Sequence, residues 1–132
     1  MLARAAAVFI ALVVTLFSTR ATAHHHIGCA NNTKTTETVT GRIMQIDWEN
    51  PHVHIHLDSV AAVDAGDWIV EMQAAYILPR EGLPRTAFNV GDTIQVVLWR
   101  AKDGSRQGFT KSITLNDGRT FAFNIAELQC PS

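Results

Sequence analysis

The sequence has no surplus of charge of either sign. Its 11 lysines and arginines stand against 12 aspartates and glutamates, which gives a formal net charge of −1. A protein without a basic surplus has no bulk electrostatic attraction to nucleic acid or to anionic lipid. We therefore do not expect nucleic acid as a partner.

Long apolar runs are also scarce, because one run near the N-terminus is the only candidate. It extends over ~13 residues from Ala5, fewer than the ~20 that a membrane-spanning helix needs. Arg4 precedes it, and Ala21-Thr22-Ala23 supplies the small residues of a signal-peptidase site. The pattern predicts a cleavable export signal over residues 1–23, a periplasmic or secreted mature chain, and no transmembrane segment.

Cysteine occurs twice, at Cys29 and Cys130. In an oxidising compartment a single pair is most simply a disulfide, so we predict a Cys29–Cys130 bridge. A second interpretation is a lipoprotein signal that ends at Ile27-Gly28-Cys29 and anchors the chain through an acylated Cys29. His26 stands where that signal requires an aliphatic residue.

The motifs of common catalytic sites are missing. The sequence has no Gly-x-Ser-x-Gly elbow, no phosphate-binding loop and no dinucleotide-binding glycine pattern. We therefore expect a binding module rather than an enzyme. A hydrolase that uses a histidine-bound metal ion is the enzymatic alternative.

What the sequence does contain is β structure, predicted over residues 37–132 after a polar, flexible arm at 24–36. The segment from His52 to Asp58 alternates polar and apolar residues, as a half-buried strand does. Further strands are expected at 36–48, 68–72, 93–99, 108–115 and 120–125. With one short helical element between the third and fourth strands, this order predicts a small antiparallel barrel of five to six strands. Its Greek-key order is that of the oligonucleotide/oligosaccharide-binding (OB) fold.

All six histidines fall into two groups, of which the second lies on the clearest strand. Residues two apart on a strand share a face, so His52, His54 and His56 are expected to project together. Two such imidazoles can bind one zinc or copper ion, but a third ligand must come from a neighbouring strand or from the arm. Glu71 on the next strand is the best carboxylate candidate. Asp47 and Glu49 are further candidates.

The first group, His24-His25-His26, begins the predicted mature chain. A free amine followed by histidine in the third position binds square-planar copper(II) or nickel(II). Alternatively, His24 chelates copper through its own amine and ring. We expect this arm to fold over the strand histidines as a mobile cap or to form a second site.

Trp48, Trp68 and Trp99 suggest a second kind of function. Exposed aromatic side chains line ligand grooves in barrels that bind single strands or sugars. On this alternative hypothesis the domain binds a partner protein or an envelope glycan, and its histidines are incidental. Tryptophans in a domain of this size also serve as ordinary core packing.

A set of short motifs resembles a family of small exported bacterial proteins of unknown function (domain of unknown function family 6152). The motifs are histidines directly after the signal, Trp48-Glu49-Asn50-Pro51-His52, Trp68-x-x-Glu71, Leu78 through Gly82, Gly91-Asp92, Ala101-Lys102-Asp103-Gly104-Ser105 and Asp117-Gly118-Arg119. The resemblance implies a periplasmic or secreted single domain in which His24, His25, His52 and Glu71 matter most. His54 and His56 are additions of this sequence to that pattern.

Overall fold

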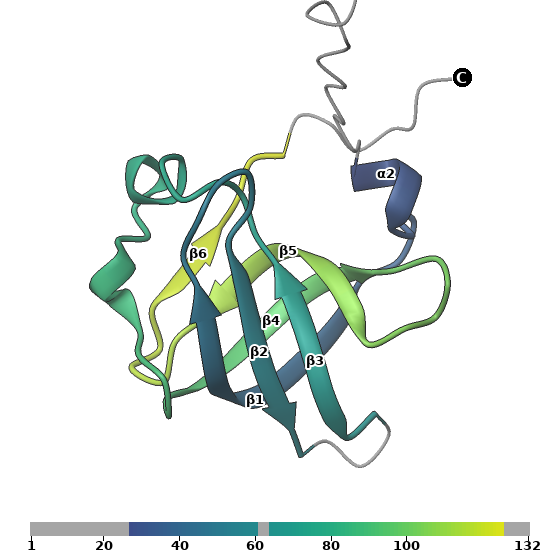
Figure 1. Cartoon of the computed structure of the whole chain (residues 1–132), viewed down its shortest axis with the longest axis horizontal. Helices are drawn as coiled ribbons and strands as arrows, with labels where there is room; N and C mark the ends of the chain where they lie inside the picture. The colour runs from purple at the N-terminus through teal and green to yellow at the C-terminus, as the bar shows by residue number, and fades with distance from the viewer. Residues whose placement is uncertain (1–26, 61–63, 126–132) are drawn as a thin grey trace, which may run out of the picture.

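The computed structural model describes residues 27–60 and 64–125, which form six strands, one short α-helix and two 3₁₀ turns (Figure 1). The strands are β1 (Glu37–Asp47), β2 (His54–Ser59), β3 (Gly66–Glu71), β4 (Thr93–Arg100), β5 (Gln107–Thr114) and β6 (Thr120–Ala122). The α-helix is α2 (Ile27–Ala30), and the 3₁₀ turns are η1 (Leu78–Glu81) and η2 (Arg85–Ala87). All six predicted strands are confirmed, with ends that differ by a few residues.

The strands form a closed five-stranded barrel, and β6 extends it beyond β5. Neighbours follow the order β3-β2-β1-β4-β5-β6, and β3 also pairs with β5 to close the barrel. This order confirms the OB-like prediction. The closing ladder is parallel, whereas every other ladder among the described strands is antiparallel. The expectation of antiparallel strands throughout fails at this seam, because five strands cannot alternate in direction around a closed ring.

The core lies inside the barrel and follows from the period-two alternation of the strands. In β2 the side chains of Ile55 and Leu57 are buried, while His54 and His56 are half-buried on the outer face. The buried cluster consists of Val39, Ile43, Val53, Ile55, Leu57, Trp68, Val70, Met72, Leu78, Leu83, Phe88, Ile94, Val96, Leu98, Ile113, Leu115 and Phe123. The inner faces of the strands therefore form the hydrophobic core, and the polar side chains that could bind a ligand lie on the outer face and in the loops.

The helical element after the third strand is confirmed as the two 3₁₀ turns. Pro79 stands in the first turn of η1, where its missing N–H is not needed. Gly82 ends η1 in the left-handed conformation (φ 91°), and its N–H is bonded to the carbonyls of Leu78 and Pro79. Leu78 and Leu83 are fully buried, so this element adds to the core.

The described part of the predicted flexible arm is hydrogen-bonded to the barrel. The Lys102 N–H donates to the Ala30 carbonyl at 2.9 Å, and the Asn32 N–H donates to the Arg100 carbonyl at 2.8 Å. Figure 1 accordingly shows α2 beside the loop between β4 and β5. In the described ranges, no helix is long and apolar enough to cross a membrane.

Candidate functional site

The strand histidines lie on the outer face of the barrel, as the alternation predicted. Hydrogen-bond register places His54 of β2 opposite Asp47 of β1 on one side and opposite Glu71 of β3 on the other. Directly opposed residues in an antiparallel pair have Cβ atoms about 4.5–5.5 Å apart. The fold therefore sets one imidazole between two carboxylates that are far apart in the sequence.

Each carboxylate is engaged by a histidine other than His54. Glu71 forms an ion pair with Nδ1 of His52, and these side chains are 34% and 31% exposed. Oδ2 of Asp47 lies 3.3 Å from Nε2 of His56. His52 also packs edge-on against the buried Phe109 ring, with 5.8 Å between ring centroids. Two histidine–carboxylate pairs thus flank His54.

Asp47 is held in its charged form. Its Oδ1 accepts a hydrogen bond of 2.7 Å from the Gln45 side-chain amide. That hydrogen bond is the largest of the effects that hold the pKa of Asp47 below its ordinary value, and His56 and His54 act in the same direction against partial desolvation. The outer face therefore carries an ionised carboxylate next to two imidazoles.

These groups surround a hollow of about 400 Å³, called here the histidine hollow. Its lining residues are Ala30, Asn31, Asp47, His54, His56, Ile69, Glu71, Ala101, Gln107 and Gly108. Two carboxylates and no lysine or arginine stand among these described residues, so the hollow favours a cation over an anion. It opens on the β2–β3 face next to the loop between β4 and β5, the region with which OB folds bind ligands.

The histidine hollow differs in membership from the predicted metal site. His54, His56, Glu71 and Asp47 line it, whereas His52 lies beside Phe109 and Glu49 is exposed on the loop between β1 and β2. Across residues 27–60 and 64–125, no three His, Cys, Asp or Glu side chains are placed to bind one metal ion together. An ion can therefore gain three such ligands only after side chains rotate.

Several lining residues had no signal in the sequence. Asn31, Gln107 and Gly108 reach the hollow through the barrel closure and the bridge between Asn31 and Ala101. The register of β3 with β5 brings in Gln107 and Gly108, the bridge to Ala101 brings in Asn31, and no spacing in the sequence indicates either pairing. The predicted arm ligands His24, His25 and His26, and the predicted disulfide partner Cys130, lie outside the described residues.

The three tryptophans lie in three different surroundings. Trp68 is buried in the barrel core, and Trp48 packs on that core 6.2 Å from the Phe88 ring centroid. Trp99 is buried as well and borders a separate hollow with Lys34 and Lys111. The histidine hollow contains none of them.

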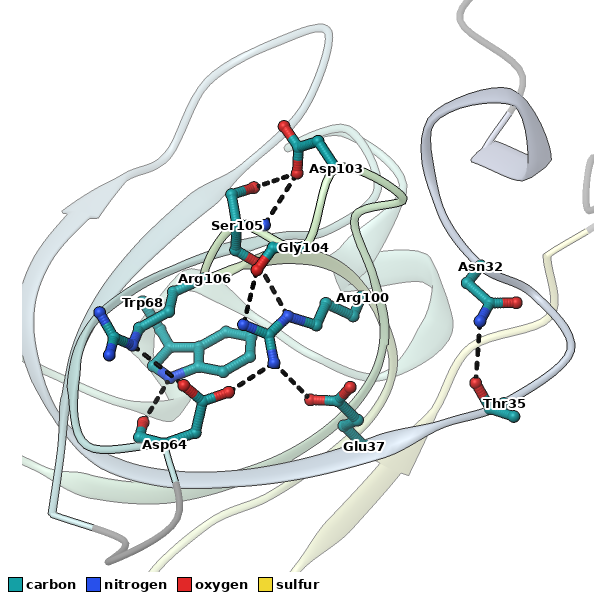
Figure 2. Close-up of polar contacts among 10 residues, drawn as sticks. All are labelled: Asn32, Thr35, Glu37, Asp64, Trp68, Arg100, Asp103, Gly104, Ser105 and Arg106. Atoms are coloured by element: carbon teal, nitrogen blue, oxygen red, sulfur yellow. Dashed lines mark hydrogen bonds and ion pairs between the residues drawn. The ribbon is translucent and has the colours of Figure 1, made fainter.

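A second charged cluster, called here the Arg100 hub, lies at the end of β4 (Figure 2). The Arg100 guanidinium lies 2.5 Å from Asp64 and 3.3 Å from Glu37, and it stacks 5.0 Å from the Trp68 ring centroid. Its Nε–H and one N–H of Nη2 donate to the carbonyls of Ser105 (2.9 Å) and Gly104 (2.7 Å). The hub therefore fixes the loop that borders the histidine hollow.

Comparison with known proteins places the chain in a family. A family model described as "Family of unknown function (DUF6152)" matches residues 11–111. The chain belongs to this family. The matched range of DUF6152 contains every residue that lines the histidine hollow and the whole Arg100 hub. A search of curated proteins finds no match.

Proposed function

We propose that this DUF6152 protein is an exported binding module that holds a copper or zinc ion in the histidine hollow. The observation that carries the proposal is the register that sets His54 between Asp47 and Glu71, with His56 on the same face of β2. Imidazole nitrogens and carboxylate oxygens are the ligands that zinc and copper(II) take in proteins. The proposed export rests on the signal-like pattern of residues 1–23.

The histidine–carboxylate pairs support this assignment. Metal-ligating histidines almost always donate their other ring N–H to a carboxylate, a carbonyl or water, which fixes the ring. His56 already has such a partner in Asp47, and Gln45 in turn holds Asp47. We assign His54 and His56 as imidazole ligands and Glu71 as the carboxylate ligand, with Asp47 orienting His56.

Metal binding by Glu71 requires that its present contact with His52 be broken. Glu71 is engaged with His52, so it reaches an ion only when that contact opens. Both side chains are about one-third exposed, and exposed ion pairs of this kind contribute only about 0–1 kcal/mol. The rearrangement is therefore inexpensive compared with formation of metal–ligand bonds.

The first measurement is metal content together with N-terminal mass, on untagged protein purified from an export compartment. We expect near-stoichiometric copper or zinc on a chain that begins at His24. A correctly cleaved chain that is metal-free and takes up no tight metal on titration would falsify the proposal. The search would then turn to a protein or glycan partner, the alternative that the tryptophans suggested.

Titration of variants then locates the site. The three arm histidines are replaced by serine in every protein, so that a site at His24–His26 does not contribute. His54→Gln and His56→Gln should each weaken metal binding by about tenfold or more. His52→Gln is the control, and it should weaken binding less because His52 precedes β2 and does not line the hollow.

A further inference from the structure

A β-bulge in β1 presents a methionine beside the proposed metal site. Ile43 pairs with Leu57 and Gln45 pairs with His56, which leaves Met44 as the extra residue of β1. At such a bulge two residues of one strand oppose a single residue of the other. Met44 and Gln45 therefore share His56 as their cross-strand neighbour.

The exposure of Met44 is not explained by packing. Met44 is 55% exposed at the bulge, beyond Arg42, where the pairing of β1 with β4 ends. Met72, the other methionine in the described ranges, is fully buried in the core, where methionine is usually found. Without the bulge, strand alternation would give β1 one fewer side chain on this face.

The thioether and the imidazole border one hollow. Met44, Gln45, His56, Leu57 and Asp67 line a depression of about 280 Å³ next to the histidine hollow. His56 lines both depressions, so it stands between the sulfur of Met44 and the groups around His54. A metal ion bound by His56 can therefore take further ligands from the histidine hollow or from the depression that Met44 lines.

Sulfur changes which ion such a site prefers. Thioethers are soft, polarisable ligands that select copper(I), whereas zinc is well served by imidazole and carboxylate alone. We propose that Met44 makes the site selective for copper, with the Met44 sulfur and the His56 imidazole as ligands of copper(I). This inference rests on the function proposed above and names the ion that the site is built to hold.

The test compares two ions and two methionines. Copper(I) affinity is measured without oxygen, by competition with a chromogenic copper(I) chelator, and zinc affinity is measured by a parallel competition. All proteins carry the serine substitutions at His24–His26 and retain both cysteines, so that any contribution from sulfur at Cys29 is common to all. Met44→Leu removes the thioether at similar volume, and Met72→Leu is the control at a buried site.

Met44→Leu should weaken copper(I) binding by about tenfold or more and change zinc binding by less than about twofold. Met72→Leu should change neither. Copper K-edge absorption should show a copper–sulfur distance in the parent that Met44→Leu abolishes. Unchanged copper(I) affinity in Met44→Leu, with affinity lost in His56→Gln, would overturn the role of Met44 and leave the metal site standing. A parent that binds neither ion would instead refute the proposed function and this inference together.

Discussion

The Arg100 hub and the histidine hollow are both clusters of charged side chains on the outside of one small barrel, yet they differ in how their groups are satisfied. In the hub, the Arg100 guanidinium donates to two carboxylates and two backbone carbonyls and lies over an indole ring. In the hollow, two carboxylates and two half-buried histidines border an open space, and one of the carboxylates, Glu71, is paired with His52 outside the lining.

The difference separates a structural cluster from a binding cluster. Arg100 has its hydrogen bonds supplied by the protein, so the hub needs no ligand and ties two loops to the barrel. The side chains of the hollow have fewer partners each and are about one-third exposed, so an incoming cation can replace one of their present contacts. The presence of charged side chains does not distinguish the two clusters. The number of hydrogen bonds that the protein supplies to each charged group does.

The largest expected effect is stabilisation of the protein by its metal. A ligand that binds only the folded state at 100 times its dissociation constant stabilises by about 2.7 kcal/mol. Copper or zinc should therefore raise the urea midpoint of the arm-substituted protein, and a chelator should reverse the rise. The His54→Gln, His56→Gln double variant should keep the metal-free midpoint and lose the rise. A rise that survives in this variant would place the metal elsewhere.

Arg100→Ala should be the strongest test of the structural cluster. Loss of a partly buried arginine leaves Glu37 and two carbonyls without this donor and leaves Asp64 with Arg106 alone, and we expect a loss of about 2 kcal/mol in unfolding free energy. Arg119→Ala is the control, because Arg119 and its partner Asp117 are both about half exposed, and it should cost less than about 0.5 kcal/mol. Equal losses, measured by urea unfolding, would remove the distinction between the hub and an ordinary surface pair.

The sequence was informative where one short segment determines the outcome. The alternation from His52 to Asp58 correctly gave the outer face of the histidines, and Gly82 correctly marked the end of the helical element. The order of elements was enough for the OB-like barrel. Each of these features depends on local periodicity or on the backbone freedom of glycine.

The sequence was least informative where distant segments meet. Asp47 was a secondary candidate, yet the pairing of β1 with β2 sets it directly opposite His54. The bulge at Met44 leaves no mark in the pattern, because one extra residue in a strand looks like ordinary sequence. The Arg100 hub joins residues up to 63 positions apart, and no spacing rule connects them.

Asp47→Asn should produce a smaller effect, on affinity rather than on stability. Loss of the charge removes the carboxylate that orients His56, and changes in such outer partners typically weaken metal binding by about 10–100-fold. Asp58→Asn is the matched control, since Asp58 is exposed on the neighbouring strand β2 but does not line the hollow. Metal competition titrations compare the two variants. Equal effects would mean that general surface charge, and not the position of Asp47, determines affinity.

The smallest expected effect concerns the loop that the hub holds. Asp103 accepts hydrogen bonds from the Ser105 hydroxyl (2.6 Å) and N–H (2.9 Å), and these bonds hold its pKa below the ordinary value of 3.8. A pKa that is lowered in the folded state contributes stability above the unfolded pKa, and this contribution is lost as pH falls through the folded pKa. Asp103→Asn should therefore lower the urea midpoint near neutral pH, and the difference from the parent should shrink below about pH 4. A difference that persists in acid would show that the variant loses packing rather than charge.

The Ser105 carbonyl accepts a hydrogen bond from Arg100, so the loop and the hub are in direct contact. If they act as one unit, the acid-sensitive part of the difference in urea midpoint that Asp103→Asn causes should be smaller in an Arg100→Ala background.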